Sequence, residues 1–134
     1  MAKIMLVEDA ADTCELITAV LEMAGHTVDA AVTGEEGFTK IQTLRPDVIL
    51  MDMSLPGRLS GLDVVHLLRA DSTFDETPIL ALTAHALVDD RRRSLEVGCD
   101  EHLTKPIFDL EEFNRIVSSY AEHGRKFAER LVQA

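Results

Sequence analysis

Acidic side chains follow two apolar runs of this sequence at the point where each run ends. Asp52 comes directly after residues 48–51, and Glu8 and Asp9 come directly after residues 3–7. A continuous apolar run of this length, closed by turn residues, is typical of a strand that is buried on both faces of a sheet. Open α/β sheets bind ligands in the crevice at the carboxyl ends of their strands. A lone acid there would be a solvated strand end or a helix cap, but several polar strand ends together indicate chemistry.

A hydroxyl and an ammonium group complete this set of polar strand ends. Thr83 ends the apolar run 79–83, and Lys105 follows the weaker run 99–104. Carboxylates crowded within a few ångström resist ionising together, and Mg2+ removes that conflict because it takes oxygen ligands and keeps several waters. Asp52 could attack phosphorus and form an aspartyl phosphate, while Mg2+ and Lys105 neutralise the phosphoryl charge and Thr83 donates a hydrogen bond. A salt bridge between Lys105 and the acids is the simpler alternative, and it is compatible with that role.

The elements that must position these residues alternate between strand and helix patterns five times. Strands are expected at residues 3–7, 27–31, 48–51, 79–83 and 99–104. Apolar residues at helical spacing follow each strand, and capping patterns precede three of these helices, at Thr33 with Glu36, Ser60 with Asp63, and Asp109 with Glu112. Residues 71–77 are expected to form a polar loop. The alternation predicts an α/β fold with a doubly wound parallel sheet, whose carboxyl strand ends all meet at one edge.

Composition limits the classes of partner. The chain has 134 residues, enough for one domain, and a formal net charge of −11. That charge argues against binding to nucleic acid or to an anionic membrane surface, and favours cations and basic protein patches. The sequence contains no apolar stretch of membrane-spanning length, and Cys14 and Cys99 lack metal or redox spacing. We therefore expect a cytoplasmic protein with reduced thiols.

Four motifs in a fixed order give the chain a family resemblance. LVED, DVILMDMSLPG, ILALTA and LTKPI together resemble a response-regulator receiver domain, the phospho-acceptor half of two-component signalling. The resemblance implies a receiver domain over residues 1–121, with residues 122–134 as an extension of the last helix or a tail. It also implies the flavodoxin-like (βα)5 fold with a five-stranded parallel sheet of order 2-1-3-4-5.

The resemblance also implies roles for individual residues. Asp52 would be the phosphorylation site, and Glu8 and Asp9 would be the acidic pair that positions Mg2+. The main-chain carbonyl of Ser54 would be a further metal ligand. Thr83 would be the switch hydroxyl, and Lys105, followed by a cis peptide bond, would be the phosphoryl-binding ammonium.

Three features depart from the usual family pattern. Glu8 stands where Asp is commoner, so its metal contact could run through water. The loop of residues 57–61 looks one residue longer than usual, which would place Arg58 near the mouth of the pocket. His102 stands where the family often has a switching aromatic residue. It could rotate inward and add a titratable group, or it could be a partly exposed strand histidine.

Two further residues are expected to tune the lifetime of the phosphoryl group. Ser54 lies two residues after Asp52, and His85 lies two residues after Thr83. Their side chains should flank the path of the attacking water without being needed for phosphorylation. The alternative is that both are ordinary loop residues.

Several functions are compatible with such a site. The first is a single-domain response regulator that receives its phosphoryl group from a histidine kinase or histidine phosphotransfer protein. It would signal through a downstream protein target on the face of the fourth helix, fifth strand and fifth helix. It would not be an enzyme beyond self-catalysed phosphotransfer and autodephosphorylation. A receiver-like module that binds partners without phosphorylation is the main alternative.

Two enzymatic or cofactor-binding alternatives are weaker. An Mg2+-dependent aspartyl-phosphate phosphatase would often carry a second acid two residues after the nucleophile, where this chain has Ser54. A flavin-binding module would need a hydroxyl- and glycine-rich loop after the first strand, where this chain has two acids.

The last helix is expected to continue past the domain as a contact surface. Apolar residues recur as far as Phe127, Leu131 and Val132, and Gly124 interrupts them. Such a surface could bind a partner or a second copy of the chain, giving a homodimer. A frayed tail is the alternative.

Overall fold

A computed structural model of the protein describes residues 1–84 and 88–125. The expectations for His85 and for Phe127, Leu131 and Val132 therefore lie outside the described residues. The strands are β1 (Lys3–Val7), β2 (Thr27–Ala31), β3 (Val48–Asp52), β4 (Ile79–Thr83) and β5 (Glu101–Thr104). The helices are α1 (Ala11–Met23), α2 (Gly34–Leu44), α3 (Gly61–Arg69), α4 (Val88–Val97) and α5 (Leu110–His123), with a short 3-10 helix, η1 (Ser72–Phe74).

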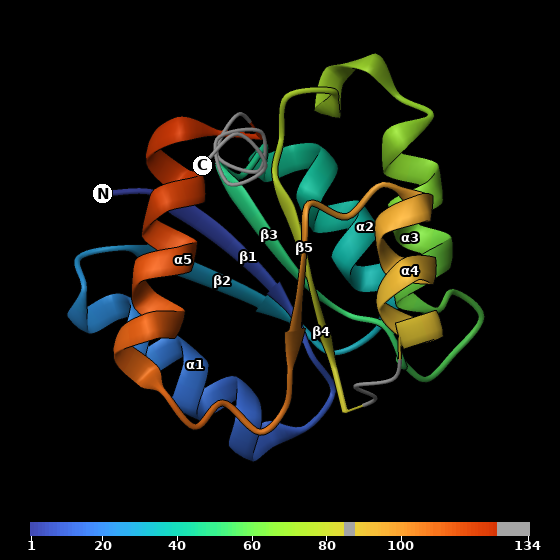
Figure 1. Ribbon diagram of the computed structural model, residues 1–134. Coiled ribbons are helices and arrows are strands. Elements are labelled where there is room, and N and C mark those ends of the chain that lie inside the picture. The colour runs from blue at the N-terminus through green and yellow to red at the C-terminus, as the bar shows by residue number, and fades with distance from the viewer. Residues whose placement is uncertain (85–87, 126–134) are drawn as a thin grey trace.

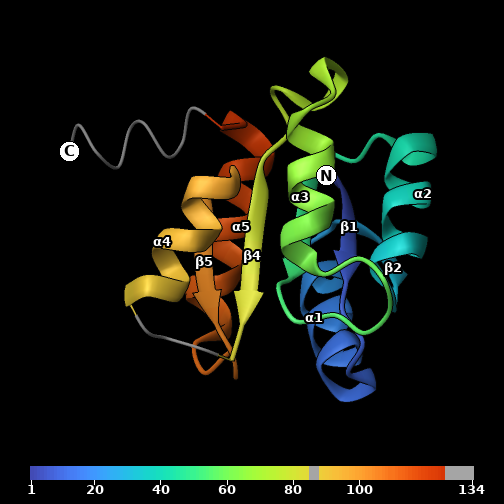
Figure 2. The ribbon, with the colours of Figure 1, turned by 90° about the vertical axis from the view of Figure 1, so that its right-hand side faces the viewer.

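The five strands form one parallel sheet in the order β2-β1-β3-β4-β5. Helices α1 and α5 cover one face of this sheet, and α2, α3 and α4 cover the other (Figures 1 and 2). This arrangement confirms the expected flavodoxin-like (βα)5 fold and its 2-1-3-4-5 strand order. It places the carboxyl ends of all five strands at one edge.

Alternate residues of the central strands supply two separate cores. Met5, Ile49 and Met51 pack with residues of α2 and α3. Successive strand side chains point to opposite faces, so Leu6 and Leu50 pack instead with residues of α1 and α5. Every residue of β3 and β4 is buried, as the continuous apolar runs predict.

Side-chain caps begin three of the helices where the sequence indicated them. Thr33 accepts a hydrogen bond from the Glu36 N–H, and Asp109 accepts one from the Glu112 N–H. Ser60 and Asp63 form a reciprocal capping box at the start of α3. These caps fix where α2, α3 and α5 start relative to the sheet edge that carries the acids.

The segment expected to be a polar loop, residues 71–77, contains a buried anchor. Its 3-10 turn buries Phe74 against the core shared by α2 and α3. Because the residues around Phe74 are polar, the sequence pattern did not indicate this contact. The Phe74 carbonyl accepts a hydrogen bond of 2.7 Å from the Arg69 guanidinium.

A cluster of charged groups closes the edge of the sheet opposite to the acids. Asp100, directly before β5, accepts hydrogen bonds from Arg69 at 3.1 Å, Arg125 at 2.8 Å and the Ile79 N–H at 3.0 Å. The Asp100 side chain is only 6 % exposed. A buried carboxylate needs such partners, because leaving it unpaired would cost several kcal/mol. The cluster joins α3, β4, β5 and the residue pair that follows α5.

The end of α5 is defined by a glycine. The helix ends at His123, and Gly124 follows with φ of +63°, a backbone conformation that L residues rarely adopt. The helix thus extends two residues past Ala121, the expected end of the domain. Arg125, the last residue described, bonds back to Asp100 and to the Asp75 carbonyl.

Candidate functional site

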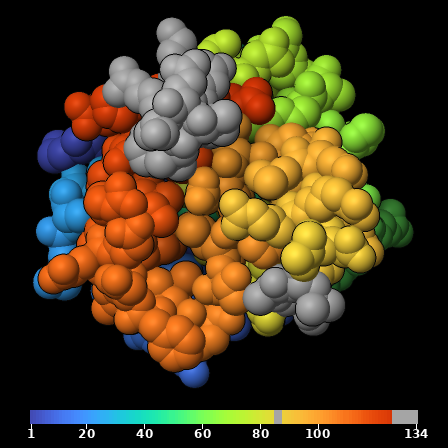
Figure 3. Space-filling model, viewed as in Figure 1, coloured from blue at the N-terminus to red at the C-terminus, as the bar shows by residue number. Residues whose placement is uncertain are grey.

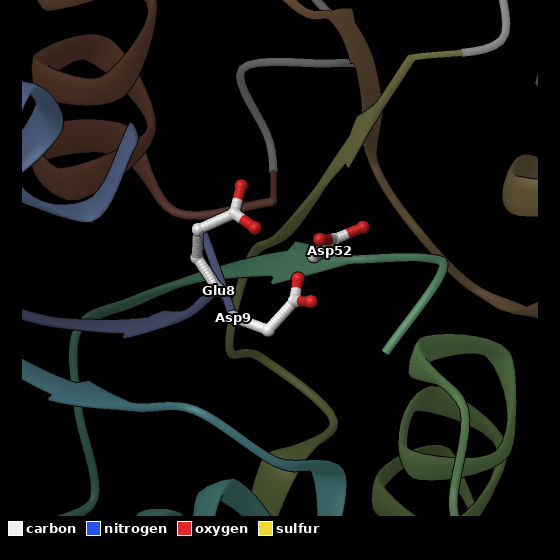
Figure 4. A group of neighbouring side chains, drawn as sticks. All are labelled: Glu8, Asp9 and Asp52. Atoms are coloured by element: carbon white, nitrogen blue, oxygen red, sulfur yellow. The ribbon is translucent and has the colours of Figure 1, made fainter. Parts of the chain in front are cut away.

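The sheet brings five residues that are far apart in sequence to one edge. Asp52 and Thr83 are the last residues of β3 and β4, Glu8 and Asp9 follow β1, and Lys105 follows β5. Figure 4 shows the side chains of the three acids gathered where β1 and β3 end. The expectation that these strand ends meet is therefore met by the fold.

Lys105 links the two buried acids directly. Its Nζ atom lies 2.8 Å from Glu8 Oε1 and 3.2 Å from Asp52 Oδ2. Glu8 is fully buried and Asp52 nearly so, while the Lys105 side chain is 17 % exposed. The Lys105–Pro106 peptide bond is cis, as the family resemblance implies. The salt bridge considered in the sequence analysis is thus present, and it holds the ammonium against the Asp52 carboxylate.

The two buried carboxyl groups titrate differently. Burial, together with the hydrogen bond to Asp52, raises the pKa of Glu8 to about 7, because the hydrogen bond from Lys105 offsets only part of the rise. Burial also opposes ionisation of Asp52, but hydrogen bonds from Glu8, the Ser54 N–H and Lys105 outweigh it and lower the Asp52 pKa. The pKa of Lys105 is raised, because its two acidic partners outweigh its burial. Near neutral pH, Asp52 is therefore ionised while Glu8 retains a proton part of the time.

The three acids have the chemistry and spacing of a divalent metal site. Glu8, Asp9 and Asp52 each offer a carboxylate oxygen, and these oxygens lie within 4.8 Å of one another. Asp9 is exposed, so the site is open on one side to solvent. The Ser54 N–H donates to Asp52 Oδ1 at 2.9 Å, which brings the Ser54 main chain beside the acceptor carboxylate. A hard cation such as Mg2+ fits this donor set because it prefers oxygen ligands.

A polar cavity of about 440 Å³ lies beside these groups. Ser54 and Thr83 line it on the side of the acids, and Asp90, Arg93 and Ser94 line it on the side of α4. Arg93, the last of three consecutive arginines in α4, thus lines this cavity. The spacing of Asp90, Arg93 and Ser94 within one turn of a helix was the available signal.

His102 is buried rather than partly exposed. Only 8 % of the residue is accessible, and its Nδ1 atom lies 3.3 Å from the Ser94 Oγ. The same Ser94 hydroxyl donates to the Asp90 carbonyl at 3.1 Å. His102 thus packs under α4, two residues before the end of β5. The alternative of a partly exposed strand histidine is wrong, and Ser94 is a contact that sequence reasoning missed.

A family model provides the decisive comparison. The model of the response regulator receiver domain matches residues 4–118. The chain belongs to this family. Receiver domains are phospho-acceptors of two-component response regulators rather than enzymes in the ordinary sense. Aspartate phosphorylation, Mg2+ and contact with histidine kinases or phosphotransfer proteins are general to them.

Curated relatives extend well beyond the receiver domain. The DNA-binding dual master transcriptional regulator RpaA of Synechocystis is 38% identical over 112 residues, which cover 84% of this chain and 46% of that protein. The DNA-binding response regulator MtrA of Mycobacterium tuberculosis is 37% identical over 131 residues, 96% of this chain and 55% of that protein. The chain thus spans about half the length of these relatives.

Solved receiver structures match nearly end to end. The chemotaxis response regulator CheY4 of Vibrio cholerae has a TM-score of 0.82 and 31% identity, with 89% of this chain and 98% of that chain covered. The receiver domain of a sensor histidine kinase from Pseudomonas aeruginosa has a TM-score of 0.82 and 35% identity, covering 90% and 98%. The latter holds a magnesium ion in its active-site cleft. Among the residues described here, no helix has the length and apolar character needed to cross a membrane.

Proposed function

We propose that this receiver domain accepts a phosphoryl group on Asp52 and works as a single-domain response regulator. The donor would be a histidine kinase or a histidine phosphotransfer protein, and the reaction would depend on Mg2+. The observation that carries this proposal is the contact of the buried Asp52 carboxylate with the partly buried Lys105 ammonium, beside carboxylate oxygens that could hold a divalent cation.

The geometry supports a direct transfer to Asp52. A carboxylate oxygen of Asp52 forms the new bond to phosphorus as the bond from phosphorus to the donor's nitrogen or oxygen breaks. The Lys105 ammonium, already beside Asp52, neutralises charge on the transferred group. Thr83, at the end of the neighbouring strand β4, would donate a hydrogen bond from its hydroxyl to a phosphoryl oxygen. When bound, Mg2+ supplies the remaining positive charge, and Glu8, Asp9, Asp52 and the Ser54 carbonyl would hold it.

The output would run through protein contacts. Figure 3 shows α4, β5 and α5 side by side on one face of the molecule. Val88 and Phe108 at the acceptor end of this face are 82 % and 89 % exposed. These two apolar side chains would be accessible to a protein partner or to a second copy of the chain.

The test is phosphorylation of purified protein by a small acyl phosphate with Mg2+, followed by mass spectrometry. The wild type and the control Asp12→Asn should each gain one phosphoryl group, because Asp12 is an exposed residue of α1. Asp52→Asn should gain none, and chelation of Mg2+ should abolish labelling. Equal labelling of Asp52→Asn and wild type would refute the assignment.

The same experiment separates the alternatives. A module that binds partners without phosphorylation would leave the wild type unlabelled. An Mg2+-dependent phosphatase would release phosphate continuously from added phosphomonoesters, whereas the proposed acceptor turns over only its own phosphoryl group.

A further inference from the structure

The loop between β3 and α3, residues 53–60, passes beside the acceptor site. Its first part has contacts of its own, because the Ser54 N–H bonds to Asp52 Oδ1 and the Leu55 side chain packs in the core. Its last residue, Ser60, caps α3. The part between these anchors is held by a side chain from outside the loop.

That side chain is Glu35, in the first turn of α2. Its Oε1 atom accepts a hydrogen bond of 2.7 Å from the Leu59 N–H. Gly57 has φ of +98°, and a Cβ added to it would lie 3.0 Å from Glu35 Oε2. The carboxylate therefore lies directly against the Gly57 main chain, in the turn that only glycine readily adopts.

The main chains of α2 and the loop also touch. A Cβ added to Gly34 would lie 2.4 Å from the Leu59 carbonyl oxygen, so α2 can approach the loop this closely only with glycine at its first position. Leu59 is partly buried against the core. Glu35 and Gly34 together hold residues 57–59, which belong to the loop of residues 57–61 that looks one residue longer than usual for the family.

The charge of Glu35 suits this position. Hydrogen bonds from backbone N–H groups, first its own and then those of Leu59 and Arg58, lower its pKa. It also stands at the amino end of α2, where the helix dipole favours a negative charge. The carboxylate is thus ionised at neutral pH and held by main-chain donors.

We propose that Glu35 is a positioning residue for the acceptor site, holding residues 57–59 so that the Ser54 main chain stays in place beside Asp52. The connection is short and stiff. Only Leu55 and Pro56 separate Ser54 from Gly57, and the fixed φ of Pro56 removes one of the few backbone torsions that could absorb a displacement of Gly57 before it reaches Ser54. The proposal rests on the function proposed above, in which the Ser54 carbonyl is a metal ligand.

Mg2+ binding measured by calorimetry without any phosphodonor tests this proposal. Glu35→Ala and Glu35→Asp should each weaken Mg2+ binding, by roughly 10-fold as for other residues that orient metal ligands. The shorter aspartate keeps the charge but cannot reach Leu59. Glu35→Gln retains an acceptor oxygen and should bind Mg2+ like the wild type. Glu36→Ala is the matched control, because it removes an equal charge from the same helical turn, away from this loop.

Phosphorylation kinetics provide the second measurement. In Glu35→Asp the Mg2+ concentration for half-maximal labelling should rise, while the rate at saturating Mg2+ should change little. Wild-type Mg2+ affinity in Glu35→Asp, or an equal loss in Glu36→Ala, would overturn the proposal. If Glu35→Ala fails to fold, Glu35→Asp decides the question. A wild type that binds Mg2+ but takes no phosphate would refute the proposed function and leave the test of Glu35 intact.

Discussion

Two consecutive acids at the end of β1 occupy different surroundings. Glu8 is fully buried and bonds to Lys105, whereas Asp9 is exposed on the open side of the site. A metal ion that recruits Glu8 must compete with Lys105 and with the proton that the raised pKa of Glu8 favours. Asp9 has a shorter side chain and no such competition from Lys105.

We therefore predict that Asp9 dominates metal binding. Asp9→Ala should weaken Mg2+ binding more than Glu8→Ala does, as measured by calorimetric titration of both variants. Glu8→Ala removes a partner of Lys105 as well as a potential ligand, so its thermal stability should be recorded with its affinity. A larger loss of affinity in Glu8→Ala would show that the order of the pair is reversed.

At the residue scale, the sequence was sufficient to predict which side chains of the site lie together, but not how their pKa values shift. Asp52, Thr83 and Lys105 end strands of one parallel sheet, and that topology alone brings them together. The raised pKa of Glu8 depends on complete burial, which no local pattern reveals. The contact between His102 and Ser94 depends on how α4 lies on β5, so it also needed the three-dimensional structure.

At the scale of elements, one glycine sets how closely α3 approaches the acceptor strand. A Cβ added to Gly61 would lie 2.1 Å from the Asp52 carbonyl oxygen, which is main chain and cannot move aside. A Cβ added to Gly37 would lie 2.7 Å from a methyl group of Val7, which is a side chain. The start of α3 is therefore fixed directly on the backbone of the acceptor residue.

Gly61→Ala is expected to destabilise the protein by about 1–3 kcal/mol, because an oversized group in a packed site forces backbone shifts. Gly37→Ala, the comparison variant, should cost less, since Val7 can adjust. Urea unfolding of both variants measures the difference. Because the displaced carbonyl belongs to Asp52, Gly61→Ala should also slow labelling by an acyl phosphate. Equal stability of the two variants would contradict this account.

His26, between α1 and β2, links the N-terminal residues of the chain to α5. His26 Nδ1 accepts a hydrogen bond of 3.2 Å from the Ala2 N–H, and its Nε2 lies 3.0 Å from Ser118 Oγ on α5. Burial and the positive N-terminus lower the pKa of His26 below its ordinary value of 6.5. These contacts could not be predicted from the sequence, because contacts with residues so distant along the chain leave no local pattern.

The lowered pKa predicts a pH dependence of stability. The folded protein binds the His26 proton more weakly than the unfolded chain, so the stabilising contribution is complete above pH 6.5 and is lost as the pH falls below it. In His26→Gln, whose side chain does not titrate, this loss should be absent. Urea unfolding at several pH values on both sides of this point measures it. Equal pH slopes for wild type and His26→Gln would contradict the prediction.

The elements themselves were largely predictable, with one exception that has a physical reason. Continuous apolar runs located β3 and β4, and capping residues located the starts of α2, α3 and α5. The turn that buries Phe74 was missed because its neighbours are polar and its partners come from other elements. The burial of Phe74 can be recognised only once the positions of α2 and α3 are known.

At the scale of the whole molecule, Arg125 separates the domain from the residues that follow. Its bonds to Asp100 and to the Asp75 carbonyl make it part of the fold. A truncation that removes Arg125 therefore changes domain stability as well as the tail. The boundary for testing the tail as a contact surface belongs one residue later.

Deleting residues 126–134 should leave thermal stability and phosphorylation unchanged but weaken association, measured by light scattering or by pull-down of a kinase. Deleting residues 125–134 should lower thermal stability as well, because Asp100 then loses one of its two guanidinium partners. If both truncated proteins associate as the full chain does, the tail is no contact surface. Equal melting temperatures would show that Arg125 contributes nothing.

The charged cluster at Asp100 has a consequence for how this receiver domain could transmit a signal. It fastens the starts of β4 and β5 and the end of α5 to α3, at the edge of the sheet opposite to Asp52. These hydrogen bonds restrain the α4, β5 and α5 face at that edge, so we expect it to move least when Asp52 is phosphorylated. A displacement of this face that begins at the acceptor edge would be largest at that edge and smaller toward Asp100. A partner that distinguishes the phosphorylated from the unphosphorylated form would therefore do so best by contacting Val88 and Phe108. Contacts with Gly98 would distinguish the two forms least.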